Sequence, residues 1–342
     1  MKWIPALLLA LCLLSACADQ PKTTAAMPDV DGVVIALVDT GVSTAAIDPE
    51  RLLPGHNYVT DSEDTEDRIN HGTAVASVIV GCESAEVEGL APRTYLVSLV
   101  VTDKVEGEVK SVAPDVLAQA IRDAVDVYGA DVINVSLGVK KDADELRQAV
   151  AYAEQQGAVV VSAVGNEGKD DARYYPAAYD TVLAVGSHDR DGEVSAFSQQ
   201  NGTADILAPG EDVWLASRNG VTYGARGTSY ATAYISAAAA LLLEQAPGLT
   251  PQEVRQRLTD TAEGGDETTP GRLDLEAALD VSGHQPELAA AKGVYDEDLY
   301  HRRAGGGPAS DLGDIHPAGT GCTGRERRPH HGSGRCTALL PL

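Results

Sequence analysis

The stretch "DVINVSLGVKKDADELRQAVAYAEQQGAVVVSAVG", residues 131–165, decides the fold class. It begins with an apolar run typical of a buried strand, continues with helical spacing up to Gly157, and closes with a second apolar run. Two strands joined by a helix of this length pair in parallel, because the chain must cross the sheet before it returns. The stretch therefore predicts an α/β fold with a parallel sheet.

The same alternation of strands and helices extends from about residue 31 to residue 281. Further strands are expected in "GVVIALVDTG" (32–41), "TYLVSLVV" (94–101) and "DTVLAVGS" (180–187). Further helices are expected after His71 and in residues 113–129, 235–245, 251–262 and 272–280. This order predicts a mainly parallel central sheet with helices on both faces.

The N-terminal residues 1–16 have the pattern of an export signal. Lys2 precedes the apolar run "WIPALLLALCLL", which is shorter than the roughly 20 residues of a membrane-spanning helix. The following "LSAC" resembles the lipobox of bacterial lipoproteins, which implies lipidation of Cys17 and anchoring in the bacterial cell envelope. Ala18, and not Asp, directly follows Cys17, so the outer membrane is the expected destination. Cleavage after Ala18, which would give a secreted protein, remains open.

Composition separates the ends of the chain from its centre. Residues 17–30 form a polar tether, and residues 282–342, rich in Gly, Pro, His and Arg, are expected to be a disordered tail. The formal net charge of -25 argues against a nucleic-acid partner, because phosphates would be repelled. The acidic residues 59–67, "VTDSEDTED", either bind calcium or form a solvated loop, and no other metal or cofactor is expected.

Four polar residues stand where a parallel sheet collects its functional groups, at the carboxyl ends of strands and the starts of helices. Asp39 and Asn166 each follow an apolar strand pattern, and His71 and Ser229 each stand at a helix start. Each has a structural alternative when taken alone: Asp39 as a turn former, and His71 or Ser229 as a helix cap. Together they offer an acid, an amide donor, a base and a hydroxyl.

Acyl transfer needs this set of groups. A serine hydroxyl is weakly acidic, so a neighbouring imidazole must take its proton during attack. A carboxylate fixes the tautomer of the imidazole and stabilises its charged form. An amide donor and a backbone N–H at a helix start can stabilise the oxyanion that develops.

Four motifs in order resemble those of the subtilisin-like serine proteases, the subtilases: "VDTGV" (38–42), "HGTAVAS" (71–77), "SAVGNEG" (162–168) and "GTSYAT" (227–232). The resemblance covers roughly residues 31–281. It implies a subtilisin-like three-layer fold and a catalytic domain that hydrolyses peptide bonds in proteins.

The resemblance also implies a role for each residue of the set. Asp39 would orient His71, the general base and acid, while Ser229 attacks and Asn166 stabilises the oxyanion. Two alternatives stay open: an inactive subtilase-like protein that binds peptides, and a peptide cyclase or ligase that uses the same triad.

A substrate pocket follows from the resemblance as well. An extended protein or peptide substrate would pair with its walls as an added strand. The implied wall residues are Ser136, Leu137 and Gly138 on one side and Ala163, Val164 and Gly165 on the other. Tyr174 stands where relatives often have Gly at the base of the S1 pocket, so we expect a shallow S1 that favours small P1 residues.

Three positions depart from the usual family text. Tyr230 replaces Met, Ala233 replaces Pro and Ala74 replaces a common His. Because Ala suits a helix better than Pro, the helix after Ser229 is expected to form. Residues 18–29 are too few for an inhibitory propeptide, so we expect the domain to fold unaided, with a partner, or with the tail.

Overall fold

Strand β1 (Val34–Asp39) runs through the interior, and all six of its residues are buried. The computed structural model, which describes residues 27–280, places β1 in a seven-stranded sheet with the order β11-β10-β9-β8-β1-β5-β2, in which all neighbours pair in parallel. The other strands are β2 (Leu52–Asn57), β5 (Tyr95–Val100), β8 (Val132–Val135), β9 (Val159–Ala163), β10 (Leu183–His188) and β11 (Ile206–Pro209).

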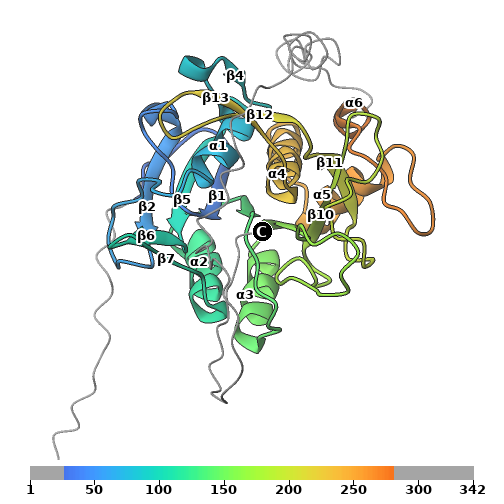
Figure 1. Cartoon of the computed structure of the whole chain (residues 1–342), viewed down its shortest axis with the longest axis horizontal. Helices are drawn as coiled ribbons and strands as arrows, with labels where there is room; N and C mark the ends of the chain where they lie inside the picture. The colour runs from blue at the N-terminus through green and yellow to red at the C-terminus, as the bar shows by residue number, and fades with distance from the viewer. Residues whose placement is uncertain (1–26, 281–342) are drawn as a thin grey trace, which may run out of the picture.

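Helices cover both faces of this sheet (Figure 1). One face carries α2 (Pro114–Asp126) and α3 (Asp144–Gln155). The other carries α1 (Gly72–Val80), α4 (Thr228–Gln245), α5 (Pro251–Asp260) and α6 (Leu275–Leu279). Alternate residues of β1 enter the two hydrophobic cores, with Ile35 and Leu37 on the α4 side and Ala36 on the α2 side. The α/β, three-layer, mainly parallel fold expected from the sequence is confirmed.

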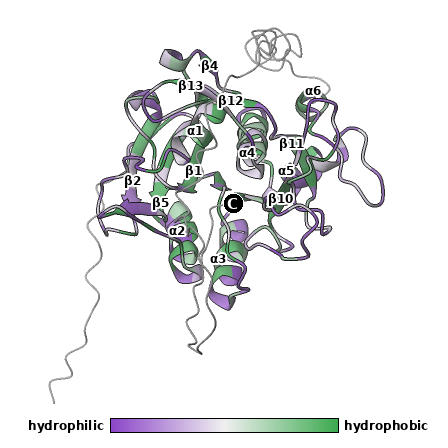
Figure 2. Ribbon diagram, viewed as in Figure 1, coloured by the Kyte–Doolittle hydropathy of each residue, from purple (hydrophilic) through white to green (hydrophobic). Residues whose placement is uncertain are grey.

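Hydropathy differs between the outer helices and the sheet they cover. Figure 2 shows both hydrophilic and hydrophobic colours on α2 and α3, whereas the strands of the sheet are mostly hydrophobic. Helix α4 is buried along most of its length, from Thr228 to Leu243, and it remains one continuous helix with Ala233 inside it. The expectation that this helix forms without the usual Pro is therefore confirmed.

Apart from the short β11, strand β2 is the part of the sheet that the hydrophobic pattern did not predict. Pro54 and Gly55 interrupt its sequence, and the pairing register with β5 shifts between Leu53 and His56. The strand lies at the edge of the sheet, where a proline removes no ladder hydrogen bond. A side chain at Gly55 would place its Cβ 2.1 Å from the carbonyl oxygen of Ser98, so this close approach requires glycine.

Short 3-10 helices and hairpins lie in the connections between the main strands and helices. Two 3-10 helices are η1 (Pro49–Arg51) and η2 (Glu83–Ala85), and three antiparallel hairpins are β3 (Gly81–Cys82) with β4 (Val87–Glu88), β6 (Asp103–Val105) with β7 (Glu108–Lys110), and β12 (Val213–Ala216) with β13 (Thr222–Ala225). Within residues 27–280, no helix has the length and apolarity needed to cross a bilayer. The expected signal, Cys17, most of the tether and the expected tail lie outside the described residues.

Candidate active site

The carboxylate of Asp39, at the end of β1, meets the imidazole of His71, the N-cap residue of α1. His71 Nδ1 lies 2.7 Å from Asp39 Oδ1, which also accepts the N–H of Thr40 at 2.7 Å. The close contact depends on Gly72, because a Cβ there would lie 2.1 Å from the carbonyl oxygen of Gly41. His71 occupies the N-cap position of α1, but its side chain makes no hydrogen bond to the N–H groups of the first turn. The alternative prediction that the His71 side chain caps the helix is therefore wrong.

The environment of His71 favours its charged form. Burial of the ring lowers the pKa of His71, but the charge of Asp39, the hydrogen bond to Asp39 and the charge of Asp67 together outweigh it. The pKa of His71 is therefore raised above its ordinary value. Asp39 itself is almost completely buried, so its charge acts on the imidazole with little screening by water.

Ser229 is the second residue of α4, and Gly227, not Ser229, is the N-cap. The Ser229 hydroxyl donates a hydrogen bond to the main-chain oxygen of Ser136 at 3.1 Å, and the Ser136 hydroxyl donates to the main-chain oxygen of Ser229 at 3.0 Å. These contacts rule out the N-cap reading of Ser229. They fix the start of α4 against the end of β8.

Asn166 lies in the loop after β9 and is bonded to the residue before Ser229. Its Oδ1 accepts hydrogen bonds from the N–H of Thr228 at 2.9 Å and from its hydroxyl at 3.0 Å. These two bonds fix the orientation of the side-chain amide and direct its Nδ2 toward Gly227. The amide donor therefore stands at the same helix start as the hydroxyl of Ser229.

The two expected pocket walls lie side by side. Val135 pairs with Ser162 in the sheet, so residues 136–138 and 163–165 continue from neighbouring parallel strands. The side chains of Leu137, Ala163 and Val164 are buried, and Ser136 is bonded to Ser229. The resemblance to subtilases predicted that these residues form two walls of one pocket. The parallel pairing of β8 with β9 brings the two segments together.

The family model described as "Subtilase family" matches residues 30–288. The chain belongs to the subtilase family. It is 32% identical over 253 residues to subtilisin DY of Bacillus licheniformis, covering 72% of this chain and 90% of that protein. Among solved structures, the protease domain of PatA has a TM-score of 0.63 at 32% identity and covers 76% of this chain and 95% of its own. The prenylagaramide maturation protease PagA has a TM-score of 0.60 at 29% identity, covering 72% and 92%.

In this subtilase an ion pair joins the two walls next to Tyr174. Lys140 Nζ lies 2.9 Å from both carboxylate oxygens of Glu167 and 5.3 Å from the centre of the Tyr174 ring. Burial and a hydrogen bond to Glu167 raise the pKa of Tyr174 to about 12. The neighbouring Tyr175 pairs with Val139, which holds the Tyr174 segment against the wall. Sequence reasoning missed Lys140 and Glu167, although Glu167 directly follows Asn166.

Tyr230, the departure directly after Ser229, packs beside the imidazole of His71. Its ring centre lies 6.0 Å from that of His71, and the residue is 8% exposed. Its hydroxyl is hydrogen-bonded to Tyr223, whose hydroxyl in turn accepts from Asn70 Nδ2 at 3.2 Å. Burial raises the pKa of Tyr223 to about 12 and raises the pKa of Tyr230 well above its ordinary value, so both hydroxyls stay protonated at neutral pH. The substitution therefore adds a hydrogen-bonded contact between α4 and the residue before His71.

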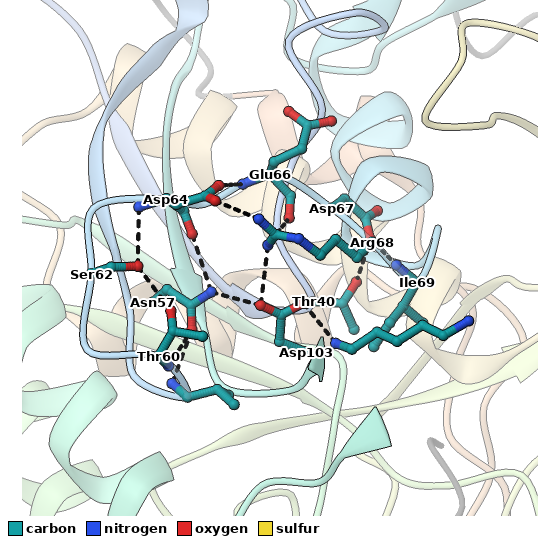
Figure 3. Close-up of polar contacts among 12 residues, drawn as sticks. Thr40, Asn57, Thr60, Ser62, Asp64, Glu66, Asp67, Arg68, Ile69 and Asp103 are labelled. Atoms are coloured by element: carbon teal, nitrogen blue, oxygen red, sulfur yellow. Dashed lines mark hydrogen bonds and ion pairs between the residues drawn. The ribbon is translucent and has the colours of Figure 1, made fainter. Parts of the chain in front are cut away.

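Arg68 forms an ion pair and a hydrogen bond with residues of the acidic stretch 59–67. Figure 3 shows the guanidinium group between Asp64 and Asp103. Arg68 Nη1 donates to Asp103 Oδ2 at 3.1 Å and to the carbonyl oxygen of Glu66 at 3.2 Å, and Nη2 pairs with Asp64. Within the part of the chain that the structure describes, no group of three or more His, Cys, Asp or Glu side chains could hold a metal ion.

Proposed function

We propose that this protein is a serine endopeptidase that hydrolyses peptide bonds in proteins through an acyl-enzyme on Ser229. The observation that carries the proposal is the 2.7 Å contact between His71 and Asp39, at the sheet edge where α4 presents Ser229. The hydrogen bonds from Thr228 to Asn166 add an oriented amide donor at the same place.

The proposed steps follow from these groups. His71 takes the proton of the Ser229 hydroxyl as its oxygen attacks the substrate carbonyl, and Asp39 stabilises the imidazolium that forms. Asn166 Nδ2 and the N–H of Ser229 stabilise the oxyanion. The C–N bond then breaks, and His71 gives its proton to the leaving amine. Water, deprotonated by His71, then attacks the ester carbonyl. The ester C–O bond breaks, His71 returns the proton to the Ser229 oxygen, and the acid product leaves as its carboxylate.

We propose that the S1 pocket accepts small P1 residues. Tyr174 is 6% exposed at the expected base of the pocket, and the Lys140–Glu167 pair bridges its walls. Bulky side chains would have to displace the buried ring. We expect kcat/KM for Ala at P1 to exceed that for Phe, and Tyr174→Gly to reverse the order. A Phe preference in the parent protein would contradict the pocket assignment.

A peptide cyclase or ligase, which transfers the acyl group to an amine, is a second candidate because transfer and hydrolysis share their first half-reaction. In either case a precursor peptide is a candidate substrate, because the chain is similar to the maturation protease PagA. Mass spectrometry of peptide products separates the two outcomes. A gain of water in the acyl fragment supports the endopeptidase, whereas a product joined to an amine or closed into a ring supports transfer. Binding of peptide by folded protein with no product would favour the inactive binding alternative. Ser229→Ala is the control and should form no product.

We propose that Cys17 carries the lipid that anchors the protein in the bacterial cell envelope, facing protein substrates there. The proposal rests on "LSAC" at residues 14–17 and on the apolar run before it. The N-terminal peptide of membrane-extracted protein should begin at an acylated Cys17. Cys17→Ala should move the protein out of the membrane fraction, and an unmodified N-terminus after Ala18 would favour the secreted alternative.

A further inference from the structure

Asp67, in the loop before α1, carries a fully buried carboxylate that the proposed triad does not use. A buried carboxylate is costly unless hydrogen-bond donors replace its water shell. Its Oδ1 accepts hydrogen bonds from Thr40 Oγ1 at 3.1 Å and from the N–H groups of Ile69 at 2.9 Å and Asn70 at 2.7 Å. Its Oδ2 accepts from the N–H of Thr73 at 2.9 Å and from the Thr73 hydroxyl at 2.7 Å.

Two of the donor residues, Thr40 and Thr73, lie at the elements that carry Asp39 and His71. Thr40 follows Asp39 at the end of β1, and its N–H donates to Asp39 Oδ1 at 2.7 Å. The Thr40 hydroxyl also accepts from the first N–H of α1 at 2.8 Å. Thr73 lies in the first turn of α1, whose N-cap is His71. Asp67 therefore connects the strand end that holds Asp39 with the helix start that holds His71.

The next residue, Arg68, is held by a separate set of contacts. Figure 3 shows its side chain extending between Asp64 and Asp103, while Asp67 is joined to Thr40 and Ile69. Asp64 pairs with Arg68 and is largely exposed. Asp64 and Asp67 are therefore two aspartates of one loop, three residues apart, of which only Asp67 is bonded to the elements that carry Asp39 and His71.

We propose that Asp67 is a positioning residue that holds Asp39 and His71 in register. The proposal rests on the proposed peptidase function, because it concerns the general base of that reaction. Asp67 acts through Thr40 and the start of α1 and does not contact the substrate in this role.

Asp67 also adds to the negative charge around the imidazole. The groups that face His71 are Asp39 from β1, Asp67 from the preceding loop and Tyr230 from α4, where Tyr230 is bonded to Tyr223 of β13. The charge of Asp67 contributes to the raised pKa of His71. Removing that charge should therefore lower the pKa of the imidazole.

The test compares Asp67→Asn with the matched control Asp64→Asn in the full chain. For folded Asp67→Asn, we expect kcat to fall on the order of 10- to 100-fold with little change in KM, because the reacting groups are misaligned. The acid limb of kcat/KM should move to lower pH. Asp64→Asn should keep the parent kcat and acid limb. A folded Asp67→Asn protein with both values unchanged would overturn the proposal.

A second pair of variants covers failure of Asp67→Asn to fold. Thr40→Val removes the hydroxyl that joins the end of β1 to Asp67 and to the first N–H of α1, and Thr40→Ser keeps it. Loss of kcat in Thr40→Val with retention in Thr40→Ser supports the proposal, and equal kcat in both overturns it. Should the parent protein cleave no peptide, NMR titration of His71 still decides. A lower His71 pKa in folded Asp67→Asn supports the proposal, and an unchanged pKa overturns it. If Asp67→Asn does not fold, the NMR signal of the His71 Nδ1–H that bonds Asp39 should change in Thr40→Val and stay as in the parent in Thr40→Ser, and the same signal in all three proteins overturns the proposal.

Discussion

His71 shows how a single residue takes its properties from its neighbours. Its ring nitrogen is fixed by Asp39 at 2.7 Å, and the ring of Tyr230 lies beside it. The charges of Asp39 and Asp67 overcome the effect of burial and raise the pKa of the imidazole. The two carboxylates that we propose to position the base therefore also raise the pH at which its imidazole becomes neutral.

The pH dependence follows from the direction of this shift. Attack by Ser229 needs neutral His71, and a raised pKa keeps the imidazole charged, hence inactive, up to a higher pH. We expect kcat/KM to fall with decreasing pH through a midpoint above the ordinary histidine value of about 6.5. The midpoint should be the same for two substrates with different leaving groups, and a midpoint below 6.5 would contradict the assignment.

Asn166 gives a second prediction at the residue scale. Asn166→Leu keeps a similar volume but removes the amide donor beside Ser229. We expect kcat to fall on the order of 10² to 10³, as measured for the equivalent change in a subtilisin, with little change in KM. Steady-state kinetics with one peptide substrate test this prediction. An unchanged kcat in folded protein would remove Asn166 from the proposed oxyanion site.

At the scale of elements, the site depends on where β1, α1 and α4 end or begin. Gly72 permits the start of α1 to touch the loop after β1. We expect Gly72→Ala to abolish peptidase activity, because its Cβ would overlap the Gly41 carbonyl and lie 3.1 Å from Asp39 Oδ1. Gly248→Ala, after the far end of α4, is a control with open space at its Cβ position. Full activity in Gly72→Ala would show that the contact is dispensable.

Helix α4 supplies a stability prediction. Ala238 is fully buried in the core between α4 and the sheet. We expect Ala238→Leu to lower the free energy of unfolding by about 1–3 kcal/mol, because the added atoms must displace well-packed neighbours. Ala151→Leu on α3, at a partly exposed position, should change it less. Denaturant unfolding of both variants makes the comparison, and equal values would contradict tight packing around α4.

The elements also show which features sequence patterns can predict. Apolar runs predicted β1, β5, β8, β9 and β10, because buried parallel strands are apolar throughout. Helical spacing of apolar residues predicted the main helices. Edge strand β2 was missed because Pro54 and Gly55 resemble a turn. The bond between Asp67 and Thr40 and the ion pair between Lys140 and Glu167 were missed because each joins residues 27 positions apart, and periodicity does not encode such tertiary contacts.

The whole molecule brings these sites to one edge of a single sheet. β1 pairs with both β5 and β8, and β8 pairs with β9, so the loops after β1, β8 and β9 follow neighbouring strands. Helix α4 packs on the same sheet and presents Ser229 against Ser136, the residue after β8. Residues separated by almost two hundred positions are thereby brought into one proposed catalytic site.

Fluorophosphonate labelling tests the central claim most directly, because this reagent reacts with a serine only when an assembled base and oxyanion site activate it. We expect the parent protein to be labelled and peptide mass to locate the label at Ser229. Ser229→Ala and His71→Ala should remain unlabelled while keeping the parent circular dichroism spectrum. Folded parent protein that stays unlabelled would contradict an assembled triad and favour a peptide-binding subtilase without catalysis.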